Sequence, residues 1–239
     1  MLSKNQIKLI ISLKQKKFRQ SHGLFVVEGI KGIKELLGSA FELYHLFETS
    51  NVFDTSINRT QITERDLLKI SFLKTPNKAL ALFKIPTSQP INNNKLIVAL
   101  DSVRDPGNLG TIIRLCDWFG IDTLVCSNKT VDCYNPKVIQ ATMGSITRVN
   151  IHYVDLEDFV RKQSNTIVFG AFMDGDTVYN ETLPDQGILI MGNEANGISK
   201  PIEALVTKRV SIPRFGKLKS AESLNVATAT AILLSEFRR

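Results

Sequence analysis

Residues 96–120 read LIVALDSVRDPGNLGTIIRLCDWFG, and this order of residue types decides the fold class. The five apolar residues at 96–100 predict a buried strand, and the polar loop after them leads into a predicted helix at 109–119. A strand that is apolar on both faces and is followed by a helix is typical of a parallel sheet with helices covering both sides.

The same alternation of strand and helix continues to the C-terminus. Further strands are expected at 123–126, 149–153, 167–172, 188–191 and 209–212, and helices at 136–143, 156–163, 201–206 and 222–237. The pattern predicts an α/β fold with a mostly parallel sheet. Because such sheets bind ligands beyond the carboxyl ends of their strands, the loops that follow strands are where site residues are expected.

Residues 1–90 are expected to form a second, smaller α/β domain. Its strands are predicted at 24–27, 43–47 and 79–83, and its helices at 30–37 and 64–69. The segment 86–94, PTSQPINNN, holds two prolines and three consecutive asparagines, which suit neither a helix nor a central strand. It is the predicted linker to the larger domain at 95–239.

The basic charge of the chain is concentrated in the smaller domain. The chain has 30 Lys and Arg against 23 Asp and Glu, and the first 94 residues hold 14 basic and 7 acidic side chains, which accounts for the whole net charge of +7. Candidate RNA-binding residues precede the first acidic residue and are Lys14, Lys16, Lys17 and Arg19. Such a segment indicates a polyanion partner, although a solvated helix face explains it equally well.

Several protein classes are excluded or disfavoured. No apolar run approaches the roughly 20 residues of a membrane helix, and no secretory segment is apparent, so a cytoplasmic protein is expected. Three cysteines without CxxC spacing and three isolated histidines predict neither disulfides nor a metal site. The fingerprints of dinucleotide enzymes, P-loop NTPases, α/β-hydrolases and zinc proteases are also missing.

The first loop of interest is 101–110, DSVRDPGNLG, which follows the strand at 96–100. Asn108 is a good N-cap candidate, so the loop could be no more than the start of a helix. Arg114 lies six residues further on, where its guanidinium could point back towards a phosphate held by the loop.

Two later loops also follow apolar strands. In 191–199, MGNEANGIS, the glycines permit close backbone approach, and Glu194 places a carboxylate at the end of the strand; a plain turn explains this loop equally well. In 212–225, IPRFGKLKSAESLN, Ser223 and Asn225 lie near the start of the predicted last helix. A capped, buried amphipathic helix is the simpler interpretation of that loop.

Taken together and in this order, the three loops resemble the three motifs of the SpoU (TrmH-like) family of the SPOUT superfamily. Residues 101–120 resemble motif one, 189–199 motif two, and 211–236 motif three. Members of this family are RNA ribose 2′-O-methyltransferases that use S-adenosylmethionine. Residues 14–37, KQKKFRQSHGLFVVEGIKGIKELL, likewise resemble the family's ribosomal-protein-like substrate-binding domain.

The resemblance implies an architecture that composition and periodicity do not predict. In this family the C-terminal part forms a deep trefoil knot, although knots are otherwise almost absent from proteins. The cofactor binds bent in the knot, and the corresponding cofactor-binding residues here are Met191, Gly192, Asn193, Ile212 and Leu224. The enzymes are usually homodimers whose active sites include residues of both subunits, and no metal is implied.

The resemblance also implies a catalytic set, which consists of Asn108, Arg114, Glu194, Ser223 and Asn225. The family gives the main role to the motif-one arginine, here Arg114, aided by Asn108. Because a guanidinium is a poor base, we expect Arg114 to clamp a phosphate and stabilise the developing alkoxide, and Glu194 to be the general base. Ser223 and Asn225 are expected to complete a polar wall.

Motif three departs from the family pattern at Arg214, where many relatives have methionine, and in a longer turn that contains Lys217 and Lys219. The expected function is 2′-O-methylation of a nucleotide in ribosomal RNA, with guanosine favoured. Transfer RNA is the alternative substrate. A non-catalytic RNA-binding or ribosome-assembly factor on the same fold is the rival, and a small-molecule methyltransferase would leave the basic domain without a task.

Overall fold

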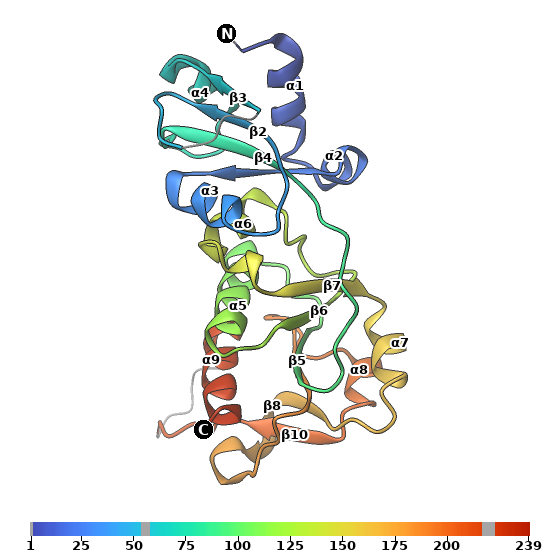
Figure 1. The fold of residues 1–239 in the computed structure, drawn as a ribbon. Helices are drawn as coiled ribbons and strands as arrows, with labels where there is room; N and C mark the ends of the chain where they lie inside the picture. The colour runs from blue at the N-terminus through green and yellow to red at the C-terminus, as the bar shows by residue number, and fades with distance from the viewer. Residues whose placement is uncertain (1, 54–57, 217–222) are drawn as a thin grey trace. The chain divides into compact units, whose positions relative to one another are not determined.

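The computed structural model describes residues 2–53, 58–216 and 223–239 (Figure 1). The chain divides into two compact units. Unit 1 consists of residues 1–87 and 132–147, and unit 2 consists of residues 88–131 and 148–239. The segment 132–147, which strand and helix order alone assigned to the larger domain, is therefore part of the first unit.

Unit 1 is built on a four-stranded sheet in the order β1-β4-β2-β3. Strand β4 is antiparallel to β1 and β2, and β2 is parallel to β3. The strands are β1 (Leu24–Glu28), β2 (Leu43–Glu48), β3 (Arg59–Gln61) and β4 (Ala79–Lys84), and the helices are α1 (Lys4–Ser12), α2 (Lys16–His22), α3 (Ile30–Leu37), α4 (Glu64–Ile70) and α6 (Pro136–Thr142). The predicted strands and helices of this region are confirmed to within two residues; β3, α1 and α2 were not among the predicted elements.

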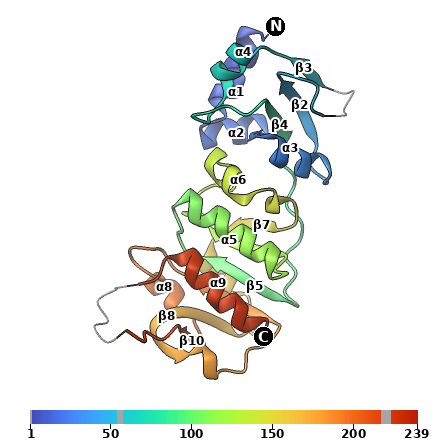
Figure 2. The same ribbon diagram turned by 90° about the vertical axis from the view of Figure 1, so that its left-hand side faces the viewer.

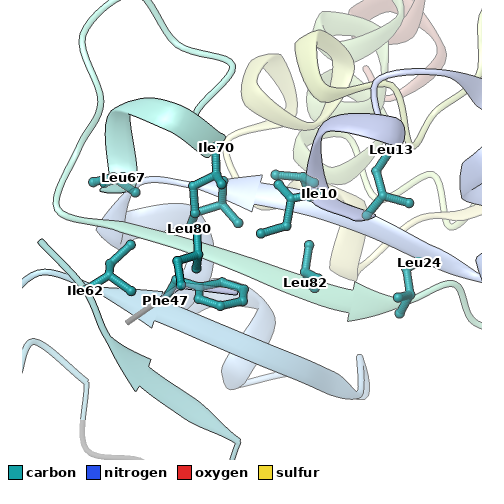
Figure 3. Close-up of a cluster of buried hydrophobic side chains, with 11 residues drawn as sticks. Ile10, Leu13, Leu24, Phe47, Ile62, Leu67, Ile70, Leu80 and Leu82 are labelled. Atoms are coloured by element: carbon teal, nitrogen blue, oxygen red, sulfur yellow. The ribbon is translucent and has the colours of Figure 1, made fainter. Parts of the chain in front are cut away.

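One apolar core holds the helices α1 and α4 on this sheet. Figure 3 shows Ile10 of α1, Leu13 directly after that helix and Ile70 of α4 in one cluster with Leu80 and Leu82 of β4. The partly buried Ile7 and the buried Ile10 and Leu13 lie three residues apart, which is the spacing that places side chains on one face of a helix. A capping box between Ser3 and Gln6 fixes where that helix begins.

The segment 132–147 is attached to unit 1 through a buried arginine. Arg19 is 2% exposed, and its Nε donates to Asp132 Oδ2 at 2.8 Å. Its Nη1 donates to the carbonyl oxygens of Leu13 and Lys14 at 2.8 and 2.9 Å, where α1 ends. The ring of Tyr134 lies 4.8 Å from that of Phe25, and helix α6 packs against β1. A buried cation is therefore satisfied by an acid 113 residues away in the chain.

Unit 2 is an α/β unit with a six-stranded sheet in the order β10-β8-β9-β5-β6-β7, in which every strand pair is parallel. The strands are β5 (Leu96–Leu100), β6 (Thr123–Ser127), β7 (Asn150–Val154), β8 (Val168–Thr177), β9 (Gly187–Met191) and β10 (Lys208–Ser211). The helices are α5 (Pro106–Trp118), α7 (Leu156–Arg161), α8 (Lys200–Glu203) and α9 (Val226–Phe237). The predicted α/β class and mostly parallel sheet are confirmed.

Helices cover both faces of this sheet. Figures 1 and 2 show α5 and α9 side by side on one face, and Figure 1 shows α7 and α8 on the other. The core under α7 and α8 includes Leu156, Phe159 and Ile202 packed against Ile97 and Ile188 of the strands. No helix among the described residues combines the length and the apolarity that a membrane span requires.

Candidate active site

The loops after β5 and β9 meet where the strand order reverses, because these two strands are neighbours and the chain continues from β5 to β6 on one side and from β9 to β10 on the other. The amide of Asp101 donates to the carbonyl of Met191 at 2.9 Å. The carboxylate of Asp101, which is 5% exposed, accepts from the amide of Ser199 at 2.8 Å and from the hydroxyl of Ser102 at 3.0 Å. Motifs one and two are thus fastened together at their bases.

The motif-two loop is closed on itself. Asn193 exchanges two backbone hydrogen bonds with Gly197, at 2.9 and 2.8 Å, and its side chain donates to the carbonyl of Ser102 at 2.6 Å. A Cβ atom on Gly192 would lie 2.3 Å from the carbonyl carbon of Gly197 and 2.4 Å from the amide nitrogen of Ile198. Gly192 is therefore required sterically, since no side chain fits between these two backbone segments.

Asn108, Glu194 and Asn225 form a continuous chain of side-chain hydrogen bonds. Asn225 Nδ2 donates to Asn108 Oδ1 at 2.9 Å, and Asn108 Nδ2 donates to Glu194 Oε1 at 2.9 Å. One residue of each motif is thereby joined to the others. The Oδ1 atom of Asn225 also accepts from the amides of Ala227 and Thr228, so Asn225 is held at the start of α9.

The predicted N-cap at Asn108 is wrong. Helix α5 begins at Pro106, and its N-cap is Asp105, whose Oδ1 accepts from the amide of Asn108 at 2.8 Å. The side chain of Asn108 is therefore left to bridge Glu194 and Asn225. The last helix likewise begins at Val226, later than the predicted 222, and Lys217 and Lys219 lie outside the described residues.

Arg114 does not join this chain of hydrogen bonds. It is exposed on α5 and forms no ion pair with any described residue. An α-helix advances 1.5 Å and turns 100° per residue, so Arg114 lies about 9 Å along the axis from Asn108 and about 120° around it. Within one chain the two side chains consequently occupy different faces of α5.

A pocket of about 1030 Å³ opens beside the chain of three side chains. All five predicted cofactor-binding residues line it, and so do Glu194, Ser223 and Arg214. Much of its remaining wall is apolar and comes from Phe172, Ile198, Val210 and Leu233. We call it the unit 2 pocket; its volume is at the upper end of the roughly 300 to 1,000 Å³ found for small-molecule sites.

One wall of this pocket was not predicted from the sequence. It comes from an irregularity in the pairing of β8 with β10. Arg209 of β10 lies opposite Gly170 and the next residue, Val210, lies opposite Asp176, so the five residues 171–175 of β8 form a bulge. Phe172, in this bulge, lines the pocket, and the guanidinium carbon of Arg209 lies 3.5 Å from its ring centroid. Arg209 donates to Glu203 at 2.8 Å and to Asp174 at 2.5 Å, and the hydrogen bond from Arg209 lowers the pKa of Asp174.

The candidate RNA-binding side chains differ in position. Lys14, Lys16 and Lys17 are exposed, and Lys14 Nζ lies 5.0 Å from the ring centroid of Phe72. Arg19 is buried against Asp132, contrary to the expectation that it faces RNA, because all its contacts lie inside unit 1.

Two features bear on metals and thiols. Among the residues that the structure describes, no group of three or more His, Cys, Asp and Glu side chains is arranged to hold a metal ion. Cys116, Cys126 and Cys133 are all buried and are not disulfide-bonded.

Comparison with known proteins gives consistent matches along the chain. The model of the SpoU rRNA Methylase family matches residues 95–235, and that of the MRM3-like substrate binding domain matches residues 4–81. The 23S rRNA (guanosine(2553)-2′-O)-methyltransferase RlmP of Bacillus subtilis is 30% identical, over 99% of this chain and 97% of its own length.

Solved structures agree over the full length. A TrmH-family protein from Porphyromonas gingivalis superposes with a TM-score of 0.91 at 38% identity and covers 100% of this chain and 98% of its own. An AdoMet-bound rRNA methyltransferase from Sinorhizobium meliloti superposes with a TM-score of 0.87 at 28% identity, over 100% of this chain and 95% of its own.

Proposed function

The chain belongs to the SpoU rRNA methylase family, and on that premise we propose that it transfers a methyl group from S-adenosylmethionine to a ribose 2′-hydroxyl of ribosomal RNA, with guanosine as the target nucleotide. The observation that carries the proposal is the hydrogen-bonded chain Asn225–Asn108–Glu194, which joins all three motifs beside a ligand-sized pocket. A factor that had lost the reaction would have no need to keep a carboxylate oriented at this place.

The residues of the unit 2 pocket fit S-adenosylmethionine. The bare backbone at Gly192 permits a ligand to approach closely, and Ile198, Val210 and Leu224 offer apolar surface to the adenosine and methionine carbons. Met191, Gly192, Asn193, Ile212 and Leu224 are the residues that would hold it. When bound, the cofactor supplies a methyl group activated by a sulfonium sulfur.

Glu194 is the group that takes the proton of the 2′-hydroxyl. Its Oε1 atom accepts a hydrogen bond from Asn108, which holds the carboxylate in one orientation. Its Oε2 atom accepts only a long one, from Asn193 Nδ2 at 3.4 Å, among the side chains that the structure describes. Asn108 in turn is oriented by Asn225. Such positioning of a base relative to its substrate lowers the barrier because the orientation is set before reaction. Ser223 and Asn225 complete the polar wall.

Arg114 requires a second copy of the chain. Because it lies on another face of α5 than Asn108, we assign it to the active site of the partner subunit in a homodimer, where it binds an RNA phosphate and stabilises the alkoxide. Trp118, at the end of α5, is 84% exposed, as expected for an interface residue.

A mixing experiment tests this assignment. Arg114→Ala and Glu194→Gln are each expected to be inactive, and refolding them together should restore about a quarter of wild-type activity, since half the dimers then carry one intact site. Mixtures that remain inactive would place Arg114 in the site of its own chain.

We also assign the trefoil knot of the family to the C-terminal part of unit 2. Three successive segments, around Gly192, Ile212 and Leu224, line the same pocket. In a knot the segment around Leu224 would pass through a loop formed by the other two, and this requires the three segments to lie together. The knot then keeps the pocket assembled without a disulfide.

Unit 1 is assigned to RNA binding. The exposed Lys14, Lys16 and Lys17 lie in the part of the chain that carries the whole excess of positive charge. Ribosomal RNA is favoured over transfer RNA because RlmP, a relative over its whole length, is a 23S rRNA enzyme. RNA binding that rests on lysines should weaken steeply as salt rises.

The direct test is transfer of labelled methyl from S-adenosylmethionine to unmodified ribosomal RNA and to bulk transfer RNA, followed by alkaline hydrolysis. A 2′-O-methyl group blocks cleavage at its own phosphodiester, so we expect label in alkali-resistant dinucleotides from ribosomal RNA. Label in mononucleotides would indicate base methylation. Label in transfer RNA alone would mean that transfer RNA, and not ribosomal RNA, is the substrate. Cofactor binding without transfer to ribosomal RNA, naked or in ribosomal particles, would favour a non-catalytic role.

A further inference from the structure

Unit 1 contains a hollow of its own, which no motif of the methyltransferase involves. It has a volume of about 430 Å³ and lies between α1 and the strands β2 and β4. We call it the unit 1 pocket; its lining includes Ile10, His45, Phe47, Asn58 and Leu82. This volume is within the roughly 300 to 1,000 Å³ of small-molecule sites.

The floor of this pocket is rigid. Ile10, Phe47 and Leu82 line it and are at the same time members of the buried core that Figure 3 shows. All three are at most 1% exposed, so the base of the hollow is an extension of the hydrophobic core. A floor of this kind offers a preformed apolar surface, which lowers the entropy lost on binding.

The wall next to this floor is aromatic. The His45 ring lies 4.6 Å from that of Phe47, centroid to centroid, at an angle of 41°, and its Nε2 is 2.8 Å from Thr60 Oγ1. Burial lowers the pKa of His45, so the ring is uncharged at neutral pH. A neutral imidazole held in this way presents an aromatic face together with polar edge atoms.

The rim of the pocket is polar and partly basic. Lys84 Nζ pairs with Glu42 Oε1 at 2.5 Å, and Tyr44 is 43% exposed. The backbone of Asn58 is fixed, since its carbonyl accepts from Leu46 at 2.8 Å, while its side-chain amide makes no hydrogen bond with any described residue. An exposed Lys8 lies on α1, the helix that forms the opposite wall.

We propose that the unit 1 pocket binds one unstacked nucleobase of the RNA substrate, with the base against the His45 ring, which Phe47 backs from the core, and with Asn58 at its hydrogen-bonding edge. RNA is recognised by sequence chiefly through splayed bases that stack on aromatic side chains and hydrogen-bond along their edges. Lys84 of the lining pairs with Glu42, so the lysine that suits a phosphate of the same strand is the exposed Lys8 of α1, next to the lining residue Leu9. The proposal rests on RNA being the substrate, and it adds to unit 1 a base-specific contact besides its charge.

The salt dependence of binding separates a base contact from a phosphate contact. In the full-length chain, with an unmodified 23S rRNA transcript as the probe, His45→Ala and Asn58→Gly should each raise the dissociation constant about tenfold at every salt concentration. The slope of log K against log salt should not change, because a base contact releases no counterions. Lys17→Ala, in contrast, should reduce that slope by about 1.

The chain offers a matched control for the histidine. His22 is exposed on α2 and does not line the pocket, so His22→Ala should bind the transcript like wild type. Melting temperature and S-adenosylmethionine affinity, measured on every variant, separate loss of the pocket from loss of the fold. Asn58 has a φ of +55°, where alanine is strained and glycine is not, so Asn58→Gly keeps the test valid if His45→Ala unfolds.

Two outcomes would overturn the inference. If folded His45→Ala and Asn58→Gly both bind and methylate the transcript like wild type, the pocket takes no base of the substrate, while the proposed function stands. The second outcome is that free GMP, AMP, CMP or UMP binds the pocket tightly and that the chain binds the transcript equally well while the nucleotide occupies the pocket. The pocket would then be a nucleotide site and not an RNA site. A wild-type chain that neither binds nor methylates ribosomal RNA contradicts the proposed function itself.

Discussion

Each unit contains a pocket and an arginine with defined partners, and the two units differ in both. The unit 2 pocket is large and mainly apolar and is lined by backbone where Gly192 lies, whereas the unit 1 pocket is smaller and has a polar rim. Arg19 of unit 1 is buried against Asp132, and Arg209 of unit 2 stays half-exposed over Phe172. Arg19 therefore fastens a distant segment to the core of its own unit, whereas Arg209 supports a ring in the wall of a pocket.

The largest effect is expected at the carboxylate beside the unit 2 pocket. Glu194→Gln keeps an oxygen that can accept from Asn108 but removes the base, so kcat should fall by about 10² to 10⁴. Affinities for S-adenosylmethionine and RNA, measured separately by calorimetry and filter binding, should stay near wild type. Glu157→Gln, on the surface helix α7, is the control and should be fully active. An active Glu194→Gln enzyme would mean that another group takes the proton.

The next effect concerns the arginine of unit 1. Arg19→Met leaves Asp132 without its partner, and loss of one member of a buried pair costs about 3 to 5 kcal/mol of the free energy of unfolding. Urea denaturation measures it, and Lys17→Met on the same helix should change stability by less than about 0.5 kcal/mol. If Arg19→Met were stable and instead reduced the salt dependence of RNA binding, Arg19 would contact RNA after all.

A smaller effect is expected where backbone forms the pocket wall. In Gly192→Ala the added methyl must displace the backbone at Gly197 and Ile198, and S-adenosylmethionine affinity should fall about 10- to 100-fold. Gly216→Ala is the matched control, because it lines the same pocket with open space around its Cβ position. Equal affinities for the two variants would show that the cofactor does not use this wall.

The smallest effect tests the stacked arginine of unit 2. Arg209→Ala frees the ring of Phe172, and loss of a partly exposed cation–π contact should weaken S-adenosylmethionine binding about threefold to tenfold without changing kcat. In a Phe172→Leu background the same substitution should have no further effect, since Arg209 acts through that ring. Arg161→Ala removes a comparable surface ion pair on α7 and should bind normally. Additive losses in the double variant would contradict the positioning role.

Local patterns predicted most of the fold because each of them depends on a short stretch. The apolar run at 96–100 and the helix at 30–37 have the predicted bounds, and the loops after β5 and β9 meet as a parallel sheet requires. The start of α5 was misplaced although the signal was present, since Pro106 directly after Asp105 marks the first helical position.

The remaining features depend on distance along the chain. The bulge that brings Phe172 under Arg209 is a matter of register between two strands, which a side-chain pattern does not encode. The burial of Arg19 depends on Asp132, 113 residues away, so the same basic residue looked like its exposed neighbours Lys16 and Lys17. Pairings of this length are visible only in three dimensions.

The discontinuous make-up of unit 1 has a consequence for the newly made chain. When residue 87 has been synthesised, the sheet of unit 1 is complete in sequence, but Asp132 and α6 are still about 45 or more residues away. At about 5 to 20 residues per second, the last residue of unit 1 follows some 3 to 12 s later. Asp132 is made 45 residues after residue 87, so for about the first 2 to 9 s of that interval Arg19 is a cation without its acid. The first unit therefore reaches its final stability only after the first part of unit 2 has been synthesised.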